Sequence, residues 1–321
     1  MMFGLLYKLV KNRCVFPVYH CVNDEKLPHI SHLYRVRTQK EFIADLDFLL
    51  KYYNPVSMQT ILEHPEILSQ KNAFHLTFDD GLRQMYDVVI PILEKKGIPA
   101  TFFINPSFLD NKELFYRFKI SLLLDILEEA PESVRREASM IAGAIPSSFN
   151  ALKNSLLKGK KNDEERINKL AELLNFDFNG FLRNYKPYMD SRQVESILKK
   201  GFTIGGHSMD HPYFPNLTKN EQIEQTIKSV DFVQEKFGLS YRLFAFPYTD
   251  YGIDATFFNH FYGNKKLLDL SFGTAGIKDD TYSRNIQRIF VEDYTSTKNA
   301  LKQEYFEYTI KKLLNKHVIP R

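Results

Sequence analysis

Two short motifs of this sequence carry side chains that could bind a metal ion and activate water. Residues 77–81 read Thr-Phe-Asp-Asp-Gly and contain two adjacent carboxylates, and residues 207–211 read His-Ser-Met-Asp-His and contain two imidazoles four residues apart. Two imidazoles and one carboxylate form a usual ligand set for zinc, and three protein ligands leave one coordination position open for water. The remaining carboxylate could deprotonate that water. Either motif alone is common in turns or on helix faces, but together they indicate a metal-dependent hydrolase.

The acidic pair follows a short apolar segment. Residues 73–78 predict a strand that ends at Asp-Asp-Gly. A helical pattern follows and ends at Gly97, and residues 100–104 predict a second strand. This order is a βαβ unit with the acidic pair at the carboxyl end of its first strand. Ligands of α/β folds bind at that end of the strands.

The two histidines have a similar setting. A strand predicted over residues 202–204 precedes them, and Pro212 follows the second histidine, so a regular helix cannot run through this point. Thr218 and Glu221 then form a capping box that opens an amphipathic helix. The histidines are therefore expected in a strand-to-helix loop.

A third motif, Phe-Ala-Phe-Pro-Tyr at residues 244–248, completes a recognisable pattern. With the first two motifs, the chain resembles the polysaccharide deacetylases with a NodB-homology domain, carbohydrate esterase family four, over roughly residues 15–110 and 188–295. The resemblance implies an α/β fold of the irregular (β/α) barrel type. It also implies metal-dependent hydrolysis of N-acetyl or O-acetyl groups on a sugar or polysaccharide.

The same resemblance implies a role for each motif residue. Asp79 would be the catalytic base. Asp80, His207 and His211 would hold a divalent metal, with zinc favoured and cobalt or nickel tolerated. The main-chain N–H of Tyr248 would help to stabilise the oxyanion.

The sequence departs from the family pattern in the groups that assist the base and the leaving group. The family's third motif carries an arginine that pairs with the catalytic aspartate, and here Ala245 and Phe246 stand in that stretch. The Asp-x-x-Asp-Trp motif and the Leu-x-His motif, which supplies the family's general acid, are absent. Arg284 and Arg288 lie near the expected fifth motif, where either could orient Asp79 or form a surface ion pair.

His20 is the candidate replacement for the missing acid. It ends the first predicted strand, so it should face the metal site, although a core histidine is the ordinary alternative. Four other histidines are expected at the surface: His29, His32, His64 and His317. Two further functions stay open: a weak or inactive deacetylase-like protein that binds glycans, and a metal-dependent hydrolase of another non-peptide carbon–nitrogen amide.

Residues 112–187 interrupt the alternation of strands and helices. Apolar residues recur there at helical spacing and no strand pattern is present, so we expect a helical insertion that serves as a lid, a partner surface or packing. The predicted organisation is therefore a first part of the barrel at 1–111, the insertion at 112–187, and the rest of the barrel with a C-terminal helix at 188–321.

Composition excludes several classes of protein. The net charge of +4 and the lack of a basic run with interleaved aromatic residues argue against nucleic-acid binding. Cys14 and Cys21 do not make a disulfide framework and are expected to be reduced.

No signal peptide or transmembrane stretch is evident, which predicts a cytoplasmic protein with a sugar or glycan as its partner. The alternative is peripheral membrane contact through apolar residues near the start of the chain: Phe3, Leu5, Leu6, Leu9 and Val10.

Overall fold

The computed structural model describes residues 13–70, 72–144, 148–158, 163–263 and 267–321. Its centre is an eight-stranded, all-parallel sheet in the order β11-β9-β8-β7-β6-β5-β2-β12. The strands are β2 (Pro17–Tyr19), β5 (Leu76–Phe78), β6 (Ala100–Ile104), β7 (Thr203–Gly206), β8 (Leu243–Ala245), β9 (Leu270–Gly273), β11 (Asn285–Gln287) and β12 (Ile289–Phe290). The predicted (β/α) barrel is confirmed.

A single residue joins the two edges of this sheet. β11 and β12 are the outermost strands, and only Arg288 lies between them in the sequence. The Arg288 N–H donates to the carbonyl of Gly273, and the Ile289 N–H donates to the carbonyl of Phe16. The chain thus steps from one edge to the other, which leaves the barrel nearly closed.

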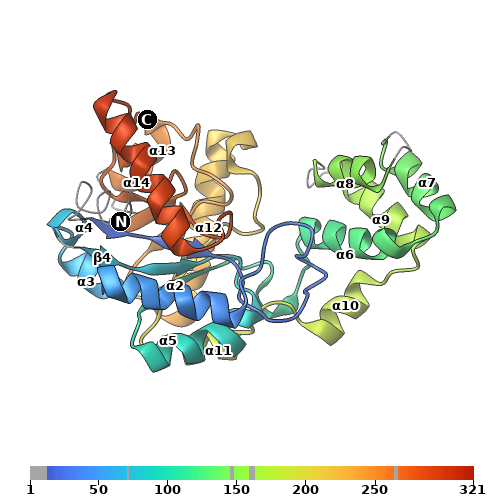
Figure 1. The fold of residues 1–321 in the computed structure, drawn as a ribbon, viewed down its shortest axis with the longest axis horizontal. Helices are drawn as coiled ribbons and strands as arrows, with labels where there is room; N and C mark the ends of the chain where they lie inside the picture. Colours follow the sequence, from blue (N-terminus) through green and yellow to red (C-terminus); the bar gives the residue numbers. More distant parts are fainter. Residues whose placement is uncertain (1–12, 71, 145–147, 159–162, 264–266) are drawn as a thin grey trace.

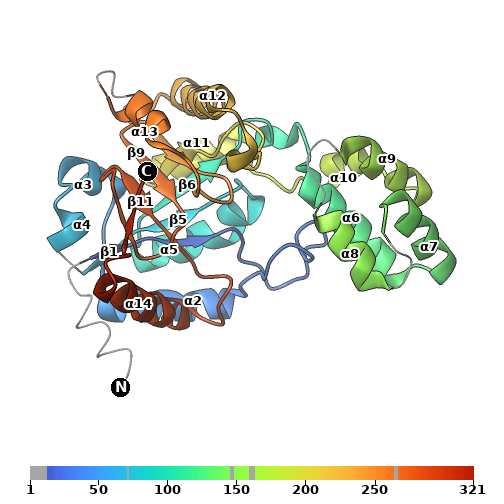
Figure 2. The same ribbon diagram turned by 90° about the horizontal axis from the view of Figure 1, so that it is seen from above.

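Helices surround the barrel (Figures 1 and 2). They are α2 (Gln39–Tyr52), α3 (Met58–Glu63), α4 (Ile67–Gln70), α5 (Ile90–Lys96), α11 (Ser191–Lys199), α12 (Lys219–Phe237), α13 (Ala255–Tyr262) and α14 (Thr297–Leu313), with the π-helix η1 (Met85–Val89) before α5 and the 3-10 helices η2 (Leu109–Asn111) and η4 (Phe214–Asn216). Local signals set several of their ends. Thr218 and Glu221 form the predicted capping box of α12, and Gly97 ends α5 with a φ of 63°.

Two predicted strands are each divided between two sheets. Residues 73–78 form β4 (Ala73–Phe74) and β5, and the first predicted strand, residues 15–19, is divided between β1 (Cys14–Val15) and β2. β1 and β4 belong to a small sheet with β3 (Asn54–Pro55), whereas β2 and β5 belong to the barrel. A further pair, β10 (Asp279–Asp280) and β13 (Val318–Ile319), lies near the end of the chain.

The segment between residues 112 and 187 forms a helical lobe beside the barrel (Figures 1 and 2). Its helices are α6 (Tyr116–Glu129), α7 (Glu132–Ile141), α8 (Phe149–Leu157), α9 (Glu164–Leu173) and α10 (Phe178–Tyr185), and its described residues include no strand. One side of α6 packs in the lobe's own core through Leu123 and Leu127, and the other packs on the barrel core through Phe118 and Leu122. α6 therefore joins the lobe to the barrel.

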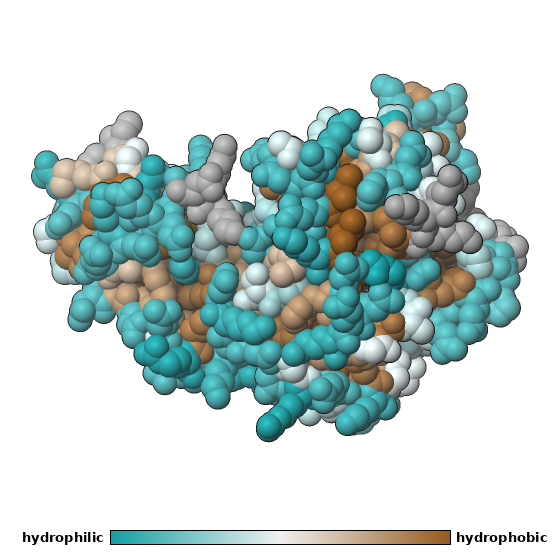
Figure 3. All heavy atoms as spheres, turned by 180° about the vertical axis from the view of Figure 1, so that it is seen from behind, coloured by the Kyte–Doolittle hydropathy of each residue, from teal (hydrophilic) through white to brown (hydrophobic). Residues whose placement is uncertain are grey.

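The space-filling view from behind shows a mainly hydrophilic surface with scattered hydrophobic patches (Figure 3). None of the described helices is long and apolar enough to cross a membrane. Cys14 and Cys21 are free thiols. The apolar residues at the start of the chain that were considered for membrane contact lie outside the described residues.

Candidate active site

The barrel brings the motif residues together at the carboxyl ends of its strands. Asp79 and Asp80 follow β5, His207 follows β7 and His20 follows β2. These four, with His211 and Tyr248, line one cavity of about 280 Å³. Parallel strands place their carboxyl ends at one rim, which is why residues far apart in sequence meet here.

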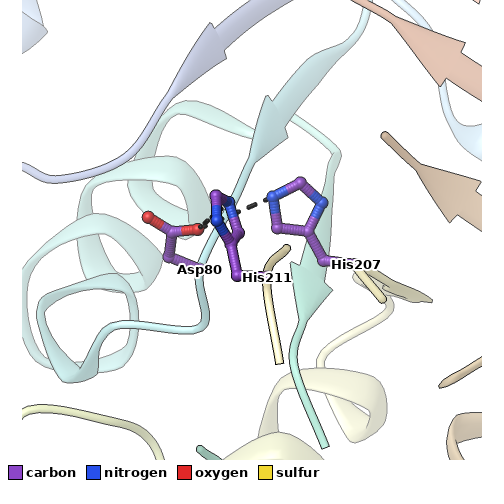
Figure 4. Close-up of side chains that lie close together, drawn as sticks. All are labelled: Asp80, His207 and His211. Carbon is purple, nitrogen blue, oxygen red and sulfur yellow. Dashed lines mark ion pairs between the residues drawn. The ribbon is translucent and has the colours of Figure 1, made fainter. Parts of the chain in front are cut away.

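Asp80, His207 and His211 point toward one another (Figure 4). Asp80 Oδ1 lies 3.6 Å from His207 Nε2 and 3.3 Å from His211 Nε2. All three residues are more than nine-tenths buried. The Oδ1 atom of Asp80 has no hydrogen-bond partner among the described residues, and such a buried acceptor is costly unless a cation accompanies it. These side chains therefore fit a divalent metal ion.

The protonation of the site also suits a metal. Burial lowers the pKa of His207 and of His211, so both imidazoles are neutral, which is the form that binds metals. The Nδ1–H of His207 donates to the carbonyl of Ala245 at 2.9 Å, which leaves Nε2 free to bind. Burial raises the pKa of Asp80, so its ionised form needs a nearby cation.

Unusual backbone conformations hold these side chains in place. Asp80, Ser208 and His211 have φ values of 73°, 61° and 57°. Gly81 has a φ of 65°, and an added Cβ would lie 3.1 Å from the side chain of Ile104, so a larger residue there would be strained. Non-glycine residues seldom adopt positive φ, and such strain gathers at functional sites.

Asp79 lies beside this group, with its Oδ2 3.7 Å from His207 Nε2, and pairs with a buried arginine. Arg288 Nη1 and Nη2 donate to the two carboxylate oxygens of Asp79 at 2.7 and 2.8 Å, and Arg288 is fully buried. Burial alone would raise the pKa of Asp79, but Arg288, His207 and His20 outweigh it and lower the pKa to about 2. Arg284 instead donates to the carbonyls of Leu268 and Asp269, so of the two arginines only Arg288 reaches the base.

His20 lines the same cavity and pairs with Glu292. Its Nδ1–H donates to Glu292 Oε2 at 2.5 Å, and Glu292 Oε1 accepts from the main-chain N–H groups of His20 and Cys21. Burial alone would lower the pKa of His20, but the carboxylates of Glu292, Asp80 and Asp79 raise it to about 9. His20 is therefore a protonated imidazole at neutral pH.

Tyr248 lies in a strained turn at the wall of the cavity. Its φ is 58°, its carbonyl accepts from Thr274 Oγ1 at 3.0 Å, and its ring packs on that of His211 at 4.6 Å. Its own N–H has no acceptor among the described residues, so it is available to an oxyanion. The start of the helical lobe completes this wall, because the guanidinium of Arg117 lies over the Tyr248 ring.

A sequence model of the polysaccharide deacetylases matches residues 68–142 and 159–263, more than half of the chain. The chain belongs to the polysaccharide deacetylase family. No curated protein sequence matches it significantly.

Solved structures of deacetylases share the fold. The deacetylase PplD of Streptococcus pyogenes, solved in complex with acetate, has 14% identity and a TM-score of 0.57, over 92% of this chain and 99% of that one. IcaB of Ammonifex degensii has 17% identity and a TM-score of 0.54, over 92% and 97%. A de-N-acetylase of Aggregatibacter actinomycetemcomitans has 18% identity and a TM-score of 0.52, over 91% and 99%.

Sequence analysis of this deacetylase-family chain missed Glu292 as a site residue. Little local signal was present, because β12 covers only Ile289–Phe290 and Glu292 lies two residues beyond it. The expectation that His29 and His32 lie at the surface was wrong. His29 is fully buried and the side chain of His32 is 5% exposed, because the helical lobe covers the loop that carries them.

Proposed function

We propose that the chain is a metal-dependent deacetylase that removes acetyl groups, foremost N-acetyl groups, from a sugar or polysaccharide. One observation carries this proposal. A candidate metal-binding set, an arginine-bound carboxylate and a protonated histidine line a single buried cavity. Asp80, His207 and His211 would hold the ion, for which zinc is favoured, and the bound ion would polarise the acetyl oxygen and supply an acidic water.

Asp79 acts as the general base. It is ionised at neutral pH because Arg288 holds both of its oxygens. Each oxygen keeps a further lone pair that can accept a proton from water. The low pKa makes Asp79 a weak base, and the two hydrogen bonds fix its direction, which holds it in an orientation suited to the reaction.

His20 acts as the general acid. The leaving nitrogen of an amide must gain a proton before it departs, and His20 carries one at neutral pH. Glu292 holds the imidazole from its Nδ1 side, so Nε2 carries the proton toward the cavity. Glu292 touches no reacting atom in this scheme and is a positioning residue.

The Tyr248 N–H stabilises the negative charge that develops on the acetyl oxygen. Its turn is fixed by the Thr274 contact, so the donor is in place before the reaction begins. The cavity lies at the small end for ligand pockets, which suits an acetyl group and the sugar ring that carries it.

The test is acetate release from acetylated sugars and oligosaccharides. The zinc-loaded protein should release acetate, chelation should stop the release, and added zinc should restore it. Asp79→Asn should keep the catalytic ion and lose most activity, whereas His211→Ala should lose the catalytic ion together with the activity. Glycan binding without acetate release by the zinc-loaded protein would reject the catalytic assignment in favour of a binding protein.

A further inference from the structure

A second group of metal-binding side chains lies outside the catalytic cavity. His32 belongs to the loop between β2 and α2, and Asp125 and Glu128 project from the same face of α6. His32 Nε2 lies 3.7 Å from Asp125 Oδ1 and 3.9 Å from Glu128 Oε2. One nitrogen and two carboxylate oxygens thus converge from two separate parts of the chain.

The distances between the ligand atoms of Asp80, His207 and His211 can be compared with those around His32. The separations between Asp80 Oδ1 and the two imidazole nitrogens are 3.6 and 3.3 Å. Metal–ligand bonds of the zinc type place tetrahedral ligand atoms roughly 3.3 Å apart. The two histidine–carboxylate separations need to contract by only a few tenths of an ångström. All three ligand atoms lie within 4.8 Å of one another, and the half-exposed side chain of Glu128 can move to close the rest.

The histidine of this group is buried without a hydrogen bond at the atom that faces the carboxylates. The side chain of His32 is 5% exposed, and its Nε2 has no hydrogen-bond partner among the described residues. An unpaired buried nitrogen is costly and calls for an explanation. A cation bound between Nε2 and the two carboxylates supplies one.

A lysine occupies part of this space. The ammonium of Lys26 lies 2.6 Å from Asp125 Oδ1, and its side chain is 61% exposed. Such a side chain can move into solvent at little cost, because an exposed ion pair contributes little to stability. Lys26 neutralises Asp125 without satisfying His32, so it competes with a metal ion for the same oxygen.

We propose that His32, Asp125 and Glu128 bind a second divalent ion, zinc by its mixed nitrogen and oxygen ligands, with a structural role. The loop and the helix that carry these ligands also form two parts of the wall of the catalytic cavity. Leu33 and Tyr34 follow His32, while Phe115 and Phe118 come from the start of α6. The ion therefore joins the loop to the helical lobe and fixes these two parts of the cavity wall relative to each other.

Zinc stoichiometry of the whole chain tests this site. Zinc is supplied from a metal buffer, the free ion is removed, and bound zinc is measured by elemental analysis. The wild-type chain should bind two ions, His32→Ala one, His211→Ala one, and the double variant none. His64→Ala is the matched control, because His64 is exposed and lies near the single carboxylate of Glu66, so this variant should keep two.

The outcomes separate this proposal from the proposed function. If the second site fails, the wild type binds one ion and His32→Ala still binds one. If the catalytic site fails instead, the wild type binds one ion and His32→Ala binds none. Glu128→Gln alters a half-exposed side chain and should reproduce the loss seen with His32→Ala without disturbing the core.

Removal of the competing lysine gives a second measurement. In the His211→Ala background only the second site remains, and Lys26→Met should tighten its zinc affinity several-fold while Lys26→Arg leaves it unchanged. Zinc should also raise the Tm of His211→Ala but not that of the double variant. An affinity that does not respond to Lys26→Met would overturn the assignment of these ligands.

Discussion

Arg288 donates hydrogen bonds to both carboxylate oxygens of Asp79 and lies where the two edges of the barrel sheet meet. It is the only residue between the two edge strands, β11 and β12, and neither member of the pair is more than 2% exposed. Its Nε also donates to the carbonyl of Gly273 on β9. One side chain therefore links the closure of the barrel to the direction of the proposed base.

We expect Arg288→Lys to reduce turnover by about 10²-fold, because an ammonium cannot form the two parallel hydrogen bonds that orient Asp79. Zinc content should stay at the wild-type level, since Arg288 is not a ligand. Arg288→Ala should in addition destabilise the fold by about 3–5 kcal/mol, because it leaves a buried carboxylate without its partner. The measurements are kcat on an acetylated sugar, zinc content and denaturant unfolding.

Arg284→Lys is the matched control for this prediction. Arg284 lies four residues earlier and binds main-chain carbonyls of the barrel without touching Asp79. It should keep nearly full turnover. Equal kinetic losses in the two variants would show that the Arg288 effect is a general disturbance of the barrel.

The Asp79–Arg288 pair should also make stability depend on pH. The pKa of Asp79 is about 2, below its ordinary value of 3.8. A carboxyl group with a lowered folded pKa stabilises fully above its unfolded pKa, and this contribution is lost as the pH falls toward 2. For metal-free protein it amounts to about 2 kcal/mol. The measurement is the unfolding midpoint of the metal-free wild type and of metal-free Asp79→Asn between pH 6 and pH 3. The two midpoints should converge as the pH falls. A constant difference between them across this range would contradict the pairing.

The sequence was sufficient for the parts of the site that follow long strand and helix patterns. Asp79, Asp80 and His207 directly follow apolar runs, and a parallel barrel places such residues at one rim. Arg288 and Glu292 were harder, because the segment that carries β11 and β12 mixes polar and apolar residues and contains no long apolar run before either side chain. Their partners are decided only when the barrel closes.

The burial of His32 could not be predicted from the residues beside it, for a different cause. Its loop has no regular pattern, and what covers it is α6, which begins more than eighty residues later. The main-chain N–H of His32 donates to Ser121 Oγ on that helix at 3.3 Å. A tertiary contact of this kind leaves no trace in the residues around the histidine.

Arg321 should influence turnover although it lies outside the cavity. It donates to the carbonyl of Asp250 at 2.7 Å and pairs with its buried carboxylate, which in turn accepts from the Thr274 N–H. Thr274 holds the carbonyl of Tyr248. Arg321→Ala should therefore loosen the oxyanion turn and lower kcat by about 10-fold, a part of the 10²–10³-fold that loss of an oxyanion donor costs.

The kinetic pattern distinguishes this effect from simple unfolding. KM and zinc content should change little in Arg321→Ala when assayed well below its Tm. Arg13→Ala is the control, because Arg13 pairs with Asp279 and reaches neither Asp250 nor Tyr248. A fall in zinc content that parallels the fall in kcat would refute a role confined to the turn.

Deprotonation of His20 should limit kcat/KM at alkaline pH, and Glu292 should set the pH at which this fall occurs. The pKa of His20 is about 9, above its ordinary value of 6.5, so the acid keeps its proton until the pH rises through the folded pKa. Glu292 is the main cause of this rise, and Glu292→Gln keeps the shape of the side chain while it removes the charge. The alkaline limb of kcat/KM for an N-acetyl sugar should therefore move to lower pH in Glu292→Gln. Asp293→Asn, which alters a neighbouring carboxylate in the same cavity, should leave the limb where it is.

Substrate chemistry provides the complementary test of His20. An alkoxide leaves more readily than an amide anion, so an ester depends less on a positioned acid, which is typically worth 10²–10⁴-fold. His20→Ala should lower N-acetyl hydrolysis by about that factor and O-acetyl hydrolysis by clearly less, with zinc content unchanged. Equal losses on the two substrates would mean that His20 supports the cavity as a whole and does not protonate the leaving group. Brisk N-deacetylation by the variant would transfer the role of acid to another residue.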